Sequence, residues 1–460
     1  MNLLFYRFLK FSPVSLKKNK TGENNMLIEK ITKLIVPLIQ KLINEVNTNM
    51  IDWFELEEQI IDFLNTIGTL IEQEIVDNIN EPHTKNTYFS TDKPIWYSYK
   101  ENRNLTFINR FGQEISKSRR CYESPNGMKC NPLDEKLGFT NCTSYSPLMT
   151  LLISEFGAEL SFLKSSKLLS DALGFKISST AVQNNTEHTG EIIPEAPKDY
   201  LSDETNEDEY DTVIVEVDGT TSPQIKETEG KTGRESLKEP TEYKECNIIT
   251  VERKKNGKSN KIYGGLYSCR QDFREYCQDF TNILNVKKSK LRAFISDGLP
   301  SNWELANAHY PDFIHILDYY HATEHIHNFG KFFVSKIEGS EISNKLCSML
   351  YEGKTRLVIK TMISNLSKIE KISVKLAKKE INYLYKNRHR MRYDKYRDLC
   401  LPIGSGTIEA ACKLVVCRRF KGNGMRWKKK DNKKVLRVRL SLLNNKLQSY
   451  FHGNKSKLIA

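Results

Sequence analysis

Apolar residues recur at helical spacing near the start of the chain and again in its second half. Residues 26–80 carry them at intervals of three and four, which predicts a helical hairpin or a partner-binding pair of helices. The same period runs from about 322 to 400 without a convincing strand, so this stretch predicts an all-helical block. Two short runs, 213–217 and 293–296, are rich in β-branched or aromatic residues, which is typical of strands buried on both faces.

Further strand patterns surround these two runs. Residues 246–251 and 263–268 predict a hairpin that turns at Asn256-Gly257, and residues 313–320 predict a fifth strand. Helical patterns at about 271–287 and 302–309 connect the later strands. A hairpin followed by strand-helix-strand steps predicts an α/β fold with a mixed sheet.

These patterns and the changes in composition divide the chain into seven regions. We expect a helical region at 1–85, an irregular aromatic and turn-rich region at 86–150, and a helix-turn-helix-like region at 151–198. An acidic linker at 199–211 follows. The strands and helices of 212–325 come next, then a helical insertion at 326–400, and finally 401–460 with a helix and a basic tail.

The region at 151–198 has the pattern of two helices joined by a short turn. Apolar residues lead into Gly174, and the run 177–182 opens a second helix with several hydroxyl side chains at its start. Candidate DNA-reading residues on this second helix are Ser178, Ser179, Thr180 and Gln183. A plain helical pair gives the same pattern, so both interpretations stay open.

Charge favours a polyanionic partner. The net charge is +13, and residues 413–460 hold fifteen Lys or Arg against one acid, Asp431. Nucleic acid fits this tail best, although a membrane surface, a solvated face or a Lys-rich coding bias gives similar counts. The candidate DNA-binding residues in the helical insertion and the tail are Arg388, Arg390, Lys413, Arg418, Arg419, Lys421, Arg426, Trp427 and Lys428. No run of eighteen apolar residues occurs, so we expect no bilayer span.

The start of the chain and the cysteines indicate a reducing compartment. The first 25 residues are basic but lack an uninterrupted apolar core, so we expect no secretion signal, and Met26 is a second candidate start. The ten cysteines show no dense regular spacing, unlike a disulfide framework. Cys121, Cys130 and Cys142 are spaced too loosely for a standard zinc site.

Three carboxylates follow or interrupt apolar runs and are candidate metal ligands. Asp218 and Asp297 each end a predicted strand in Asp-Gly, and Glu409 follows a Gly-Ser-Gly loop at the start of a predicted helix. Ligands of open α/β sheets bind beyond the carboxyl ends of strands, so the two aspartates are expected to converge. Three carboxylates can hold two divalent cations roughly 3.5–4 Å apart at a phosphate. Any single Asp-Gly is more often an ordinary turn, so the prediction depends on the three together.

A competing motif lies directly after the fifth predicted strand. His321-Ala322-Thr323-Glu324-His325 matches the H-x-x-E-H pattern of inverted zinc peptidases, in which two histidines hold zinc and the glutamate activates water. Such a site needs a third ligand, and Glu370 and Glu380 are candidates without a distinctive pattern. Five of the nine histidines lie between 309 and 327, which indicates a polar neighbourhood without identifying a metal.

The order of several motifs resembles one family. The chain carries VEVDGT at 215–220, ISDG at 295–298, ILDYYHATEH at 316–325, PIGSGTIEAACK at 402–413 and GMRW at 424–427. Over about residues 120–450 this series is similar to bacterial insertion-sequence transposases of the ISKra and ISLre type, in the Mutator-like branch of DDE transposases.

This resemblance implies an RNase H-like core interrupted by a helical insertion, preceded by a mostly helical DNA-binding region. It assigns Asp218, Asp297 and Glu409 as the catalytic, metal-binding triad, with Asp318 orienting His321 near the scissile phosphate. Relatives carry a Cys-x-x-Cys knuckle before the PLDEKLG segment at 132–138; here only scattered cysteines precede it, so region 86–150 resembles a degenerate zinc ribbon and structural Zn²⁺ is doubtful.

The implied activity is Mg²⁺- or Mn²⁺-dependent cleavage at terminal inverted repeats, followed by transfer of the 3′-hydroxyl into target DNA. Two ions are expected, because oxygen-only ligands suit these metals. Expected partners are double-stranded transposon ends and target DNA, with a homodimer or larger assembly on the DNA. The expected location is the bacterial cytoplasm, at the nucleoid. Two alternatives remain: a catalytically inactive, transposase-derived DNA-binding protein, and the zinc peptidase.

Overall fold

The computed structural model describes residues 52–90, 95–139, 144–201, 209–227 and 238–451, and a few isolated positions besides. The predicted helices before residue 52, most of the acidic linker at 199–211, Met26 and Cys142 lie outside the described residues. The chain forms two compact units, one of residues 1–137 with 144–146 and one of residues 138–143 with 147–460.

The first unit is a long helix with an antiparallel sheet. Helix α3 (Trp53–Asn78) begins at Asp52, whose side chain accepts a hydrogen bond from the Phe54 N–H at 3.0 Å. The sheet has the order β1-β2-β3-β4, and a short helix follows it. The elements are β1 (Thr87–Ser90), β2 (Ile95–Ile108), β3 (Glu114–Glu123), β4 (Lys129–Cys130) and α4 (Pro132–Leu137).

The sheet corrects the expectation that residues 86–150 are irregular and that the N-terminal part is mostly helical. Strands β2 and β3 alternate buried residues such as Tyr97, Leu105 and Ile115 with polar ones on an exposed face. Charged and amide residues on that face hid the alternation in the sequence. Cys121 and Cys130 are buried in this sheet, and burial raises the pKa of Cys130 to about 12.

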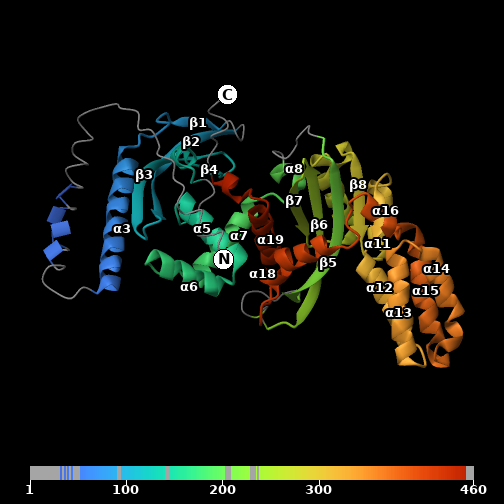
Figure 1. Ribbon diagram of the computed structural model, residues 1–460. Coiled ribbons are helices and arrows are strands. Elements are labelled where there is room, and N and C mark those ends of the chain that lie inside the picture. Colours follow the sequence, from blue (N-terminus) through green and yellow to red (C-terminus); the bar gives the residue numbers. More distant parts are fainter. Residues whose placement is uncertain are drawn as a thin grey trace. The chain divides into compact units, whose positions relative to one another are not determined.

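The second unit is built on the predicted five-stranded mixed sheet, whose order is β7-β6-β5-β8-β9 (Figure 1). Strand β6 is antiparallel to β5 and β7, while β8 and β9 run parallel to β5. The predicted turn at Asn256-Gly257 is confirmed, with φ of 51° and 75° at these residues. The strands are β5 (Thr212–Ile225), β6 (Thr241–Lys255), β7 (Lys258–Leu266), β8 (Leu291–Ser296) and β9 (Ile314–Leu317).

Two separate clusters of buried residues cover the two faces of the sheet. Val213, Val215 and Val217 of β5 pack with helix α10 (Arg270–Ile283) and helix α11 (Pro300–His309). On the other face, Ile248 of β6 packs with helix α17 (Gly406–Cys412) and helix α19 (Lys429–Leu443). Glu216 and Asp218 of β5 face α17, through contacts with Ile408 and Cys412.

The predicted helical insertion forms a group of helices beside the β9 end of the sheet (Figure 1). It is followed by α17, one turn of π-helix at Lys413–Cys417 and helix α18 (Arg418–Phe420). Within the described residues no helix is long and apolar enough to cross a membrane. The helices of the insertion and its flanks are α12 (Tyr319–Lys331), α13 (Lys336–Tyr351), α14 (Thr355–Ser364), α15 (Val374–Asn387) and α16 (Tyr393–Asp398).

The predicted helix-turn-helix region is the helices α5 (Pro147–Glu159), α6 (Phe162–Leu173) and α7 (Ser179–Ile192), followed by the short α8 (Pro197–Tyr200). Two buried arginines join these helices to the C-terminal ones. Arg439 of α19 donates to the carbonyl oxygens of Ala158 (2.7 Å) and Leu414 (2.9 Å). Arg419 donates to the Gly157 carbonyl at 2.8 Å. Both side chains satisfy carbonyl groups in the last turn of α5, where the helix dipole favours a cation.

We expect Arg439→Ala to lower the free energy of unfolding by about 3 kcal/mol, because it leaves the carbonyl groups of Ala158 and Leu414 buried without a donor. Urea unfolding followed by circular dichroism measures the change. Arg418→Ala is the matched control, since this neighbouring arginine is exposed and its loss should change stability by no more than about 0.5 kcal/mol. Equal effects of the two substitutions would contradict a structural role for Arg439.

Candidate active site

Asp218 lies in the middle of a strand, whereas the sequence predicted that the strand ends there. Strand β5 continues to Ile225 because it stays paired with β6 as far as Ile225 opposite Thr241. Its other neighbour, β8, pairs only as far as Glu216 opposite Ile295. Asp218 therefore lies just past the end of the parallel neighbour, where one edge of β5 is open.

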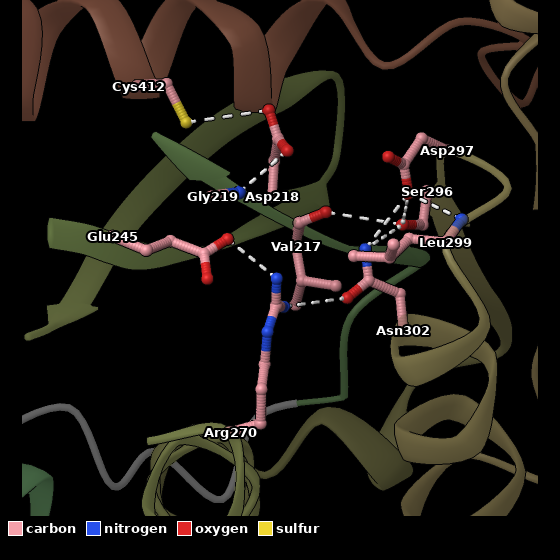
Figure 2. A network of polar contacts seen from close by, with 10 residues as sticks. All are labelled: Val217, Asp218, Gly219, Glu245, Arg270, Ser296, Asp297, Leu299, Asn302 and Cys412. Atoms are coloured by element: carbon pink, nitrogen blue, oxygen red, sulfur yellow. Dashed lines mark hydrogen bonds and ion pairs between the residues drawn. The ribbon is translucent and has the colours of Figure 1, made fainter. Parts of the chain in front are cut away.

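The Asp218 carboxylate is half-buried and has two partners. It accepts the Gly219 N–H at 2.7 Å and a contact from the Cys412 thiol of α17 at 3.7 Å (Figure 2). Burial raises the pKa of Asp218, and the negative charge of Asp297 raises it further. The two carboxylates are therefore close enough to repel each other.

Asp297 follows β8 and is held by the start of α11. One of its carboxylate oxygens accepts hydrogen bonds from the Leu299 N–H (3.1 Å) and the Asn302 side-chain amide (3.1 Å). Asn302 also donates to Ser296 Oγ at 2.9 Å, and its own oxygen faces the Arg270 guanidinium at 3.4 Å. Figure 2 shows this chain of contacts continuing from Arg270 to Glu245, at 2.7 Å. Arg270, Glu245 and Asn302 were not found from the sequence, because only the fold brings them to Asp297.

Gly298 packs closely against Tyr383 of the helical insertion. Its φ is not positive; instead, a Cβ there would lie 2.0 Å from the hydroxyl oxygen of Tyr383 in α15. Tyr383 also stacks on His325, with ring centroids 3.5 Å apart. Asp-Gly at 297–298 is therefore not a β-turn signal, because the glycine is required for packing space.

Asp318 is fully buried between β9 and the loop before α17. It caps α12 by accepting the His321 N–H at 3.0 Å, and it accepts the N–H of Ser405 at 2.6 Å and the Ser405 hydroxyl. Burial would raise the pKa of Asp318, but the interactions with His321 and Ser405 outweigh it and lower this pKa to about 2. The His321 ring nitrogen Nδ1 lies 3.7 Å from Asp318, and this carboxylate raises the pKa of His321 to about 9.

Glu409 lies in the first turn of α17 and is exposed. Beside it, the Ile408 N–H donates at 2.7 Å to Glu216, which is only 1% exposed. Burial raises the pKa of Glu216 to about 8. Glu216 was not among the predicted site residues, although a carboxylate inside the apolar run 213–217, two residues before Asp218, is itself an unusual signal.

The three predicted ligands are not gathered into one ready-made site. Among the described residues, no group of three His, Cys, Asp or Glu side chains is placed to hold a metal ion. Asp218 and Asp297 lie close together, and Glu409 lies on the helix that contacts β5. The H-x-x-E-H motif likewise forms no group of three possible ligands within the described part of the chain. His325 contacts Glu380, one of the two candidate third ligands, at 2.5 Å.

Several predicted DNA-binding residues have structural roles, which corrects those predictions. Arg390 is buried with its guanidinium 4.0 Å from the Trp303 ring centroid, and Arg419 is buried between the rings of Phe162 and Trp427. Trp427 is 7% exposed and donates to the Phe420 carbonyl at 3.2 Å. The basic residues that are exposed as predicted are Arg388, Lys413, Arg418, Lys421, Arg426 and Lys428.

Helix α7, predicted to read DNA, packs between α5 and α19 and offers little surface. Ser178 caps the helix through the Ala181 N–H at 3.1 Å, and Gln183 donates to Glu187 at 2.7 Å. Ser179 is half-buried, while Ser178 and Thr180 are exposed. The C-terminal part of α7 is tied to α19 by the Glu191–Lys434 ion pair at 2.5 Å. The exposed residues of α7 beyond its first turn are Asn184 and Glu191, and Glu191 is engaged by Lys434.

Comparison with known proteins gives a distant structural likeness. No family model and no curated protein matches the chain. Among solved structures, the chain is similar to one described as the Drosophila P element transposase strand transfer complex, with 14% sequence identity and a TM-score of 0.27. The match covers 70% of this chain and 84% of that chain. At this TM-score, the likeness establishes neither a shared fold nor a shared activity.

We expect the His321 imidazole to titrate near pH 9 and to fall toward pH 6.5 in Asp318→Asn, because an amide does not stabilise the imidazolium. NMR titration of the histidine ring protons measures both values. His309 is the internal control: burial lowers its pKa, so it should titrate below 6.5 in both proteins. An unshifted His321 would mean that the Asp318 carboxylate does not act on the ring.

Proposed function

We propose that this chain is a DDE transposase of an insertion sequence, with an RNase H-like core of the Mutator-like branch. The observation that carries the proposal is the closeness of Asp218 and Asp297 at neighbouring strands, 79 residues apart in sequence, where β5 extends past β8. The helix that bears Glu409 returns to the same strand after the helical insertion, through the Glu216–Ile408 contact. The motif series from 215 to 427 adds the resemblance in sequence.

The donor set at this edge suits a hard divalent cation. Asp218, Asp297 and Glu409 offer only carboxylate oxygens, which Mg²⁺ and Mn²⁺ prefer, and they would hold the two expected ions. Burial raises the pKa of Asp218 and the negative charge of Asp297 raises it further; a bound cation would offset this repulsion between the two carboxylates. When bound, such ions would activate a water or 3′-hydroxyl nucleophile and stabilise the leaving oxygen.

Around these carboxylates the chain supplies orientation and positive charge. Asn302 and the Leu299 N–H fix the Asp297 carboxylate, and Arg270 in turn fixes Asn302. His321 is 41% exposed and, with a pKa of about 9, carries a proton at neutral pH, so it can donate to a phosphate oxygen. Asp318 holds the imidazole of His321 toward the site while itself remaining buried. The substrates would be double-stranded transposon ends and target DNA, held by a homodimer or larger assembly.

We expect Asp297→Asn to abolish cleavage of a labelled duplex that carries the DNA flanking this gene. Binding of that duplex should change less than about two-fold, because a carboxylate does not contribute to attraction of the phosphate backbone. Gel analysis with Mg²⁺, Mn²⁺ or chelator measures nicking at the repeat boundary. Asp279→Asn, at an exposed position of α10, is the control and should cleave normally. Loss of cleavage and binding together in Asp297→Asn would mean that the site is structural.

Glu409→Gln separates the proposal from its rivals. A DDE site should lose cleavage by at least about a hundred-fold, because the amide is a poor ligand for the expected ions. The buried Glu216→Gln is the comparison: it retains an acceptor for the Ile408 N–H and should keep most activity. Binding without nicking in the native protein would favour an inactive DNA-binding descendant. Peptidase activity that survives Glu409→Gln would favour the zinc site at His321 and His325, although His325 is engaged by Glu380 and Tyr383.

A further inference from the structure

The extended ends of β5 and β6 form a two-stranded ribbon beyond the catalytic strand position. It runs from Gly219 opposite Asn247 to Ile225 opposite Thr241. The neighbouring strand β8 pairs with β5 only as far as Glu216, so one edge of this ribbon is open near Asp218. Farther along, the segment around Trp427 covers this edge. There the Ile225 N–H donates to the Trp427 carbonyl at 2.8 Å. The ribbon is thus firmly fixed, although it projects from the sheet.

A groove of about 530 Å³ lies between this ribbon and the loop 421–426. One wall consists of Thr221 and Pro223 from β5 with Thr241 and Tyr243 from β6. The other wall is the glycine-containing loop, which contributes Lys421 and Arg426. The volume is within the range of roughly 300–1,000 Å³ typical of sites for small molecules, so a single nucleotide fits its size.

Tyr243 gives the groove an aromatic surface. Its side chain is 70% exposed and stands opposite Pro223 in the ribbon, so the two side chains share one face. An exposed aromatic ring beside a small or flat residue is the usual platform on which an unpaired base stacks. A double-stranded segment offers no free base face, except at its ends.

The cations of the loop are placed to contact phosphate groups. Lys421 is exposed, and its ammonium group donates at 2.7 Å to the hydroxyl of Thr220, two residues from Asp218. Arg426 is also exposed, with one guanidinium nitrogen 3.0 Å from the Glu239 carbonyl oxygen. The residues that line the groove include these two cations and no acid, while Glu242 and Glu245 of β6 pair with Lys244 at 3.1 Å and with Arg270 at 2.7 Å. The balance of charge along the groove is therefore positive.

We propose that this groove binds single-stranded DNA next to the scissile phosphate, with an unpaired base stacked on Tyr243 and the backbone held by Lys421 and Arg426. This inference rests on the proposed function and deepens it: the transposon end is opened where it enters the site. The groove begins three residues after Asp218 on the same strand, and its lining residue Lys421 contacts Thr220, so the groove adjoins the carboxylate position along β5.

Fluorescence anisotropy with a labelled eight-nucleotide thymidine strand, in chelator, tests the groove without requiring cleavage. We expect Tyr243→Ala to weaken binding roughly ten-fold, the size of one lost base stack, and Tyr243→Phe to bind as the native chain does. Lys421→Ala should reduce the salt dependence of log K by about 0.7, the value for one phosphate on a single strand. Tyr385→Ala is the matched control, because Tyr385 is an exposed tyrosine of the helical insertion whose ring is covered by Arg388.

A second readout reports stacking directly. A 2-aminopurine base in the strand should lose fluorescence on binding to the native chain and to Tyr243→Phe, and keep it with Tyr243→Ala. Unchanged affinity in Tyr243→Ala would overturn the proposal, as would an equal loss of affinity for intact duplex, since the groove would then hold only backbone. The cleavage assay on Asp297→Asn is an independent measurement. If the native chain nicks DNA but Tyr243→Ala binds the single strand as well as the native chain does, only the proposed groove is rejected. If Tyr243→Ala weakens binding but the native chain does not nick DNA, the transposase proposal is rejected.

Discussion

The buried carboxylate of Asp318 is the interaction on which the arrangement of the site depends. It ends β9, caps α12 and accepts both donors of Ser405. Between residues 318 and 405 the chain passes through the whole helical insertion. The hydrogen bonds from Ser405 to Asp318 therefore join the two ends of this insertion. Removing a partner would leave a charge without compensation at 0% exposure, which costs far more than an ordinary hydrogen bond contributes. The same contact places α17, and hence Glu409, beside the strand that carries Asp218.

A second buried carboxylate, that of Glu216, joins the start of α17 to the sheet. Glu216 receives the Ile408 N–H at the start of α17, two residues before Asp218 on the same face of β5. Its pKa of about 8 means that metal-free protein holds this group largely protonated at neutral pH. The folded protein therefore binds a proton here that the unfolded chain, with a pKa near 4.5, releases. This group makes its stability decrease as pH rises from about 4.5 through 8.

The sequence allowed the mixed sheet, the Asn-Gly hairpin and the helical insertion to be predicted, because each depends on local periodicity or turn chemistry. The predictions from sequence were wrong at positions whose structure depends on tertiary packing. Asp218-Gly219 reads as a turn, yet β6 pairs beyond it and keeps the strand extended. Arg390, Arg419 and Trp427 read as a basic, aromatic DNA surface, yet they are buried on one another or on other rings. Charge counts cannot separate arginines that bind a polyanion from those that bind helix carbonyls.

The helical insertion does more than connect Asp318 to α17. Tyr383 on α15 contacts both Gly298, directly after Asp297, and His325 on α12. Its hydroxyl occupies the space where any other residue at 298 would have a Cβ, so the position of the Asp297 loop is coupled to the insertion. The backbone that carries Asp297 therefore depends on the packing of α15 as well as on the sheet.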